Sequence, residues 1–171
     1  GNLIRKKLFT NLKSDESIEY ILSLIFLSNL FLVLNFFTSL NKLINSLIFF
    51  IPLIYIFFLN KELIYRKIKI SLIFSIFFAL LISFDNVNRP DAGLYHLPFV
   101  SLLNENKIIF GSANLHFRFG HTSILQYLEA GFNNIVFKDL GILIPKTIFY
   151  FSISKYFLKE FFLNLNTKKS F

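Results

Sequence analysis

Three long apolar runs constrain the fold of this chain more than any other feature. They cover residues 18–37, 43–59 and 68–84, and Leu, Ile and Phe dominate each of them. A helix of about 20 apolar residues crosses the roughly 30 Å hydrocarbon core of a bilayer, so each run has about the length of a membrane span. With 54% of the chain hydrophobic and only 16% charged, the composition is far from that of an ordinary soluble domain. We predict an all-α membrane protein.

The ends of these runs carry helix start and stop signals. Ser14, Asp15 and Glu16 precede the first run, where their oxygens can accept hydrogen bonds from the free N–H groups of a helix start. Residues 38–42 predict a tight turn, and Pro52 predicts a kink in the second helix.

A fourth span is predicted at residues 141–158, which hold Lys146 near one end and Lys155 near the other. The alternative for this segment is an amphipathic helix that lies on the membrane surface. We expect such an interfacial helix at residues 3–12 as well. The chain should therefore contain about four transmembrane helices.

Basic residues indicate the direction of the spans. They are dense before the first run and at residues 60–69, and sparse at 38–42 and along 85–134. Because cytoplasmic segments carry the excess of Lys and Arg, we predict a cytoplasmic N-terminus and an extracytoplasmic loop at 85–134 that contains short interfacial helices. The same distribution accounts for the net charge of +8 without a nucleic-acid partner.

This topology divides the chain into three parts. Residues 1–84 form the interfacial segment and three spans, residues 85–134 form the loop, and residues 135–171 form the fourth helix with a cytoplasmic tail. The tail ends without a recognisable terminal domain, and the first residue is Gly. We therefore expect the chain to be the N-terminal fragment of a longer protein.

The loop contains the residue on which a catalytic hypothesis depends most, Asp91. It follows Arg89 and Pro90, a position from which a carboxylate often caps a helix. The functional alternative is a general base at the boundary between water and membrane. Four residues on, Tyr95 would share a helix face with Asp91, whereas His96 either binds a phosphate, acts as an acid or bonds a loop carbonyl.

A second polar group lies at His116, Arg118 and His121. Their spacing matches no zinc pattern and no cysteine assists them, so we predict no metal and no cofactor. The alternative, a divalent metal, has no support from the spacing. The planar guanidinium of Arg118 suits a phosphate or pyrophosphate. The alternative is a salt bridge from Arg118 to Asp85, Glu105 or Glu129.

Two helical stretches are predicted within the loop. Residues 92–105 place apolar residues on one side but are interrupted by Pro98, so we expect two short helices there. Ser123 and Gln126 form a capping-box pattern that starts a helix at about residues 124–130. Gly131 should close it.

The sequence Asp91-Ala-Gly-Leu-Tyr95-His96-Leu-Pro98 resembles a segment of bacterial multi-pass proteins similar to GT-C glycosyltransferases, including relatives of the family 39 protein mannosyltransferases. The stretch from Phe110 to Tyr127 resembles a subset of that group. The resemblance covers about residues 89–130.

The resemblance implies a many-helix transferase in the bacterial inner membrane, with an essential acidic residue in its first large external loop and a polyprenyl-phosphate sugar as donor. That acidic residue acts as catalytic base or metal ligand, and the role falls on Asp91 alone because Ala92 replaces the second carboxylate of many members. Tyr95, His96, His116 and Arg118 are the predicted substrate-binding residues.

Two other classes compete with this interpretation. A transporter or assembly subunit would place charges inside its spans, and the first three runs hold few. A small membrane protein of unknown role would use Asp91 only as a helix cap. If the transferase hypothesis is correct, we expect this N-terminal fragment to be inactive without the rest of the protein.

Overall fold

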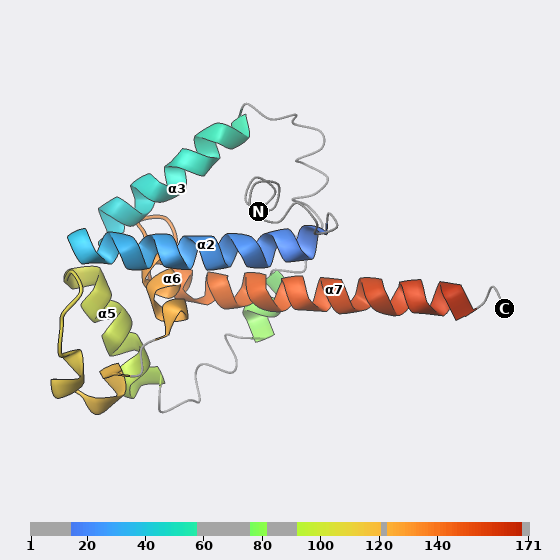
Figure 1. Cartoon of the computed structure of the whole chain (residues 1–171). Helices are drawn as coiled ribbons and strands as arrows, with labels where there is room; N and C mark the ends of the chain where they lie inside the picture. The colour runs from blue at the N-terminus through green and yellow to red at the C-terminus, as the bar shows by residue number, and fades with distance from the viewer. Residues whose placement is uncertain (1–14, 58–75, 82–91, 121–122, 169–171) are drawn as a thin grey trace.

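The computed structural model describes residues 15–57, 76–81, 92–120 and 123–168, and every regular element in these ranges is helical (Figure 1). The elements are α2 (Glu16–Phe37), α3 (Lys42–Phe57), η1 (Ala92–His96), α5 (Leu97–Glu105), η2 (Ser112–Asn114), η3 (Phe117–Gly120), α6 (Ile124–Phe132), η4 (Lys138–Leu143) and α7 (Ile144–Lys168). Residues 76–81 are also helical. The all-α prediction is confirmed.

Helix α2 begins and ends where its sequence signals predict. Asp15 is the N-cap, and its Oδ1 accepts a hydrogen bond of 2.8 Å from the backbone N–H of Ser17. The helix ends at Phe37, and the predicted turn leads to α3 at Lys42. Within the described ranges, α2 is the one helix that has both the length and the apolar composition to cross a membrane. Helix α3 is apolar but shorter, with Pro52 inside it.

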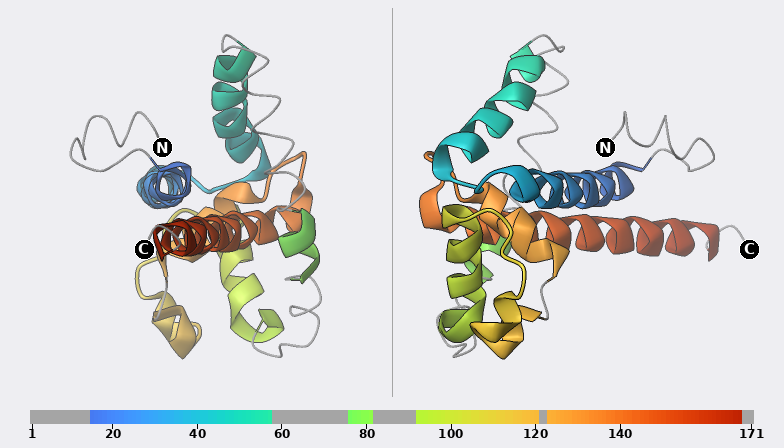
Figure 2. Two further views of the ribbon diagram at one scale, coloured as in Figure 1. Left: turned by 90° about the vertical axis from the view of Figure 1, so that its right-hand side faces the viewer. Right: turned by 60° about the vertical axis from the view of Figure 1, so that its left-hand side comes forward.

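Helix α7 runs antiparallel to α2 and extends past its start (Figures 1 and 2). Near the start of α2, Lys155 donates to Glu16 at 2.6 Å, and Lys159 pairs with Asp15. The predicted fourth span at 141–158 was wrong in its bounds, because the helix begins at Ile144 and continues to Lys168. Its charged residues keep it outside the compositions typical of a membrane span.

Helix α6 packs against both α2 and α7. Its capping box is confirmed, but Gly131 does not close the helix, which continues to Phe132. Gly131 is buried where α6 meets α2, and a Cβ there would lie 2.4 Å from the ring of Phe31. A glycine is needed because two helices approach closely, which no local sequence signal reveals.

The segment before α6 is more continuous than predicted. A single π-helical turn, η1, passes directly into α5, so Pro98 does not separate two helices. Pro98 lies in the first turn of α5, where the missing N–H has no intrahelical partner to lose.

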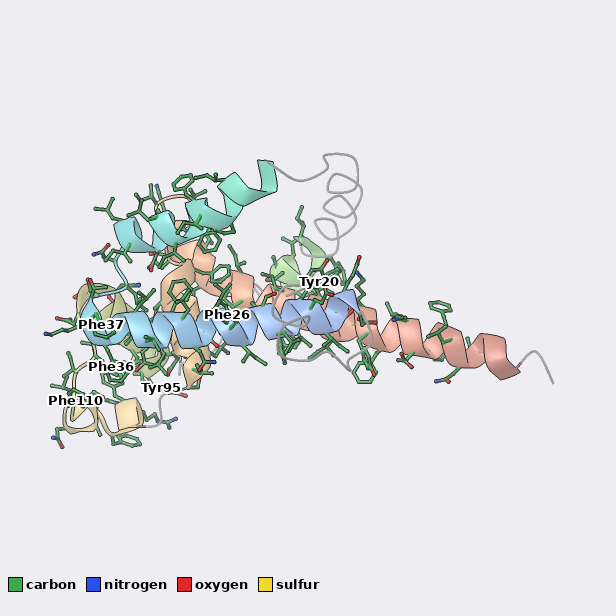
Figure 3. The ribbon with its side chains drawn as sticks, turned by 45° about the horizontal axis from the view of Figure 1, so that its top comes forward. Tyr20, Phe26, Phe36, Phe37, Tyr95 and Phe110 are labelled. Carbon is green, nitrogen blue, oxygen red and sulfur yellow. The ribbon has the colours of Figure 1, made fainter. Side chains whose placement is uncertain are left out.

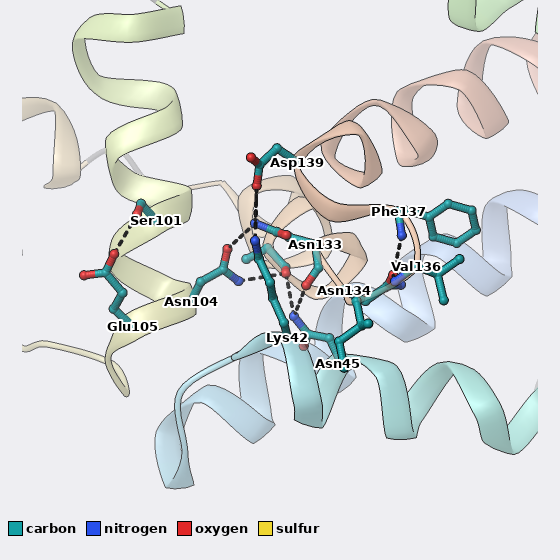
Figure 4. A network of polar contacts seen from close by, with 12 residues as sticks. Lys42, Asn45, Ser101, Asn104, Glu105, Asn133, Asn134, Val136, Phe137 and Asp139 are labelled. Carbon is teal, nitrogen blue, oxygen red and sulfur yellow. Dashed lines mark hydrogen bonds and ion pairs between the residues drawn. The ribbon is translucent and has the colours of Figure 1, made fainter.

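A network of asparagine side chains joins the ends of four helices (Figure 4). The Nδ2 of Asn45 donates to the carbonyl oxygens of Leu40, Ala130 and Asn133 at 2.7, 2.8 and 2.7 Å. Asn104 donates to two of these, Leu40 at 2.7 Å and Ala130 at 2.9 Å. Helix ends leave carbonyls without intrahelical partners, and the network satisfies them while tying α5 and α6 to the α2–α3 turn.

Much of the remaining surface is apolar. Phe36, Phe37 and Phe110 gather at the end of α2 (Figure 3), and Phe37 and Phe110 are 80% and 84% exposed. Exposed apolar surface on this scale normally contacts lipid or another part of a protein.

Some predictions fall outside the described residues. They are Asp91, His121, the helix at 3–12 and most of the third apolar run.

Candidate functional site

The π-helical turn η1 presents two neighbouring side chains to different surroundings. Tyr95 and His96 are its last two residues. The tyrosine ring lies beside His116 and Arg118, whereas the imidazole of His96 lies beside Glu129, which also pairs with Lys146. The candidate site therefore has two parts joined by one turn of backbone.

The first part is the buried cluster, which we define as His96, Glu129 and Lys146. Glu129 has 0% of its side chain exposed. Its Oε2 lies 2.6 Å from Nε2 of His96, and its Oε1 lies 3.1 Å from Nζ of Lys146. The cluster joins η1, α6 and α7. A fully buried carboxylate is costly unless it is paired, and here each oxygen lies within ion-pair distance of a side-chain nitrogen.

Gln126 connects the buried cluster to the start of α6. Its Oε1 accepts from the backbone N–H of Ser123 at 3.0 Å, which fixes the orientation of the amide. Its Nε2 therefore faces Nδ1 of His96, at 3.4 Å. In this arrangement Nδ1 is the acceptor, and Nε2 lies within ion-pair distance of Glu129 without the geometry of a hydrogen bond. Both ring nitrogens of His96 thus contact protein groups.

The second part is the exposed cluster, which we define as Tyr95, His116, Phe117 and Arg118. The guanidinium carbon of Arg118 lies 4.6 Å from the centre of the Tyr95 ring and 5.5 Å from that of Phe117. The rings of Tyr95 and His116 are stacked at 6.4 Å with an interplanar angle of 13°. A guanidinium that stacks on an aromatic ring is held in a fixed orientation. The N–H groups along the edge of the guanidinium still point outward, in a geometry that suits phosphate oxygens.

Local hydrogen bonds shape the loop that carries His116 and Arg118. Gly111 has a positive φ of 76° and starts η2, and the backbone N–H of His116 donates to Ser112 at 3.3 Å. The Nδ1 of His116 accepts from the backbone N–H of Arg118 at 3.3 Å. The loop thus holds His116 and Arg118 on the same side as Tyr95.

A family model matches residues 1–170 of the chain. The protein belongs to the family described as a domain of unknown function, DUF8201. No curated protein and no solved structure matches it.

In this DUF8201 protein, three of the predicted substrate-binding residues meet. Tyr95, His116 and Arg118 share the exposed cluster, and His96 belongs to the buried one. Their roles toward a substrate remain predictions. The described part of the chain contains no group of three or more His, Asp or Glu side chains that could hold a metal ion.

The sequence analysis did not identify Glu129 and Lys146 as partners in the site. Glu129 was considered only as a partner of Arg118, and Lys146 only as the end of a span. The sequence does carry a signal for this pairing, because Glu129 and Lys146 are each a charged residue in an otherwise apolar stretch of the DUF8201 chain. Two such residues of opposite charge commonly pair when both become buried.

Proposed function

We propose that this DUF8201 protein is part of a membrane glycosyltransferase that transfers a sugar from a polyprenyl-phosphate donor to an acceptor hydroxyl at the extracytoplasmic face. The observation that carries the proposal is the exposed cluster, in which Arg118 is oriented by Tyr95 at 4.6 Å. Tyr95 lies four residues after the acidic residue that the resemblance makes catalytic. The segment from Asp91 to Tyr95 thus supplies the acid–base group and the ring that orients the phosphate-binding Arg118.

The reaction assigns a separate task to each group. Asp91 removes the proton from the acceptor hydroxyl as its oxygen attacks the anomeric carbon of the donor sugar. The bond between that carbon and the phosphate oxygen breaks, and the phosphate leaves with the electron pair. Arg118 and His116 stabilise the negative charge of the leaving phosphate.

His96 takes a different part in this proposal. Its nitrogens contact Glu129 and Gln126, so direct contact with a phosphate requires one of these bonds to open. In the closed arrangement His96 anchors the turn that carries Tyr95. We keep His96 as a substrate-binding residue only for an open conformation of the loop, in which one of these two contacts is broken.

The membrane placement forms part of the same proposal. We infer four spans, with the α2–α3 turn and residues 85–134 outside and the N-terminus inside. The long apolar helix α2 and the exposed Phe36, Phe37 and Phe110 support contact with lipid. Lys155 and Lys159, at the opposite end of α2 from that turn, fit a cytoplasmic side.

Substitution of Asp91 tests the proposal in the full-length gene product. Membranes containing wild type, Asp91→Asn or Asp139→Asn are incubated with a panel of radiolabelled polyprenyl-phosphate hexoses. Asp139→Asn is the matched control, because its carboxylate is largely exposed and lies at the asparagine network. A lost general base lowers transfer by about a hundredfold or more, at unchanged expression.

Two results would contradict the proposal. Equal transfer by wild type and Asp91→Asn removes the base role from Asp91. Absence of transfer by the wild-type protein from every donor in the panel favours the alternative, a non-enzymatic membrane protein such as a transporter or assembly subunit.

A further inference from the structure

A cavity lies between α5 and the chain that follows it, which folds back along this helix as far as η3 (Figures 1 and 2). The volume of the cavity is about 280 Å³. Its walls come from α5, α6, η3 and residues 107–113, and they include the rings of Phe99, Phe119 and Tyr127. A cavity that combines aromatic walls with a few polar groups is typical of a site for a small molecule.

Tyr127 brings an unused hydroxyl to this cavity. The residue is 6% exposed, and its ring packs edge-on against Phe99 with 6.5 Å between the ring centres. Its hydroxyl forms no hydrogen bond with any residue that the structure describes, although buried polar groups are nearly always paired. Burial raises the pKa of Tyr127, so the hydroxyl keeps its proton at neutral pH and can donate. A ligand in the cavity would supply the missing acceptor.

Lys107 is the one charged residue among the described residues that line the cavity. Its side chain is exposed, and no acidic residue in the described ranges pairs with it. Glu105, two residues earlier, instead accepts a hydrogen bond of 3.0 Å from the hydroxyl of Ser101. The ammonium group of Lys107 is therefore available to an anion at the edge of the cavity.

We propose that this cavity binds a small aromatic acid that carries a hydrogen-bonding oxygen on its ring, opposite the carboxylate. The ring of the ligand packs against Phe99 and Phe119, because aromatic rings attract one another in edge-to-face and offset arrangements. The ring oxygen accepts from Tyr127, and the carboxylate pairs with Lys107. The inference is independent of the proposed function, since none of these residues belongs to the buried or the exposed cluster.

Equilibrium dialysis of the full-length protein in nanodiscs tests the site, with empty nanodiscs as the blank. The probe is radiolabelled para-hydroxyphenylpropionate. It is compared with phenylpropionate, which lacks the hydroxyl, and with para-hydroxyphenylpropanamide, which lacks the charge. The hydrogen bond to Tyr127 predicts about fivefold weaker binding without the hydroxyl. The exposed Lys107 predicts a smaller loss without the charge, about threefold.

Two substitutions assign each preference to its residue. Tyr127→Phe keeps the ring against Phe99 and should bind the probe about fivefold more weakly, with the preference for the hydroxyl lost. Lys107→Gln should lose the preference for the charged probe and keep the preference for the hydroxyl. Tyr150→Phe and Lys42→Gln are the matched controls and should bind as wild type, because both residues are about half exposed and neither lines the cavity.

Three results overturn the inference. They are the absence of saturable binding above the empty nanodiscs, equal binding of the three compounds to wild type, and an unchanged preference for the hydroxyl in Tyr127→Phe. Melting temperatures are measured on the same preparations. If Tyr127→Phe lowers the melting temperature, Lys107→Gln still decides, because it changes an exposed side chain. An unchanged preference for the charged probe in that variant also contradicts the site.

Discussion

The buried cluster and the exposed cluster begin at adjacent residues, yet their side chains are built for different tasks. Glu129 is fully buried and uses both oxygens within the protein. Arg118 is exposed and stacks over Tyr95. Buried charges hold their partners in fixed positions, because separating them leaves a charge in an apolar place. Exposed charges contribute little to stability and can reorganise around a ligand.

This contrast shows that one turn of backbone can hold a side chain firmly on one side and present another side chain to solvent on the other. His96 anchors η1 from one side through Glu129, and Tyr95 presents the other side to solvent and to Arg118. We therefore expect substitutions in the buried cluster to change stability first, and substitutions in the exposed cluster to change function first.

The largest effect is expected from Glu129→Ala. It removes the shared partner of Lys146 and His96, and breaking a buried ion pair costs about 3–5 kcal/mol. Because both partners are partly exposed, the loss in the free energy of unfolding should lie near the lower end, about 3 kcal/mol. Chemical denaturation in detergent, followed by circular dichroism, measures it.

A charge-balanced variant is the control for this prediction. Glu129→Gln combined with Lys146→Gln removes both charges and should cost clearly less than Glu129→Ala. If the double variant is the less stable protein, the buried cluster does not act through its charges.

A smaller loss is expected from Gly131→Ala. The added Cβ would lie 2.4 Å from the ring of Phe31, which is itself 0% exposed and cannot move aside. Overpacking of this kind costs about 1–3 kcal/mol. Gly93→Ala is the matched control, since nothing lies within 4 Å of its added Cβ. Equal melting temperatures for the two variants would show that α2 and α6 do not pack as described.

The contrast between Gly131 and Asp15 shows what the sequence could reveal. The start of α2 at Asp15 and the capping box at Ser123 are local patterns, and the structure confirms both. The connection predicted at 38–42 is one residue shorter, because Lys42 already belongs to α3. Gly131 was assigned to a helix end because local rules place glycine there. Its real reason is Phe31, a residue distant in sequence.

The same limit applies to the candidate site. Tyr95, His116 and Arg118 were recognised by residue type, although only the fold brings them together. The partnership of Glu129 with Lys146 and His96 depends on the packing of η1, α6 and α7. A single sequence does not show which residues far apart along the chain will pack together.

A weaker effect is expected at Asp15, which lies at the start of α2. Burial raises the pKa of Asp15, but the hydrogen bond from Lys159 and the backbone N–H of Ser17 outweigh it, so the pKa lies below its usual value. A lowered pKa adds stability above the ordinary aspartate range, and this stability is lost as pH falls through the lowered value.

Asp15→Asn isolates that charge because asparagine caps a helix about as well as aspartate. The variant should be slightly less stable than wild type at neutral pH, and the difference should shrink as pH falls from about 4 toward the lowered pKa of Asp15. Melting temperatures across pH 3–7 measure the difference. A constant difference across that range would contradict the pairing of Asp15 with Lys159.

Arg118→Lys should have the smallest effect on stability and tests the central claim, that the exposed cluster binds the donor phosphate. Lysine keeps the charge but loses the planar donor geometry and the stacking on Tyr95. The measurement is sugar transfer and melting temperature on one preparation of the full-length protein. We predict a melting temperature close to that of wild type and transfer lowered by about tenfold or more. Unchanged transfer at unchanged stability would contradict the account.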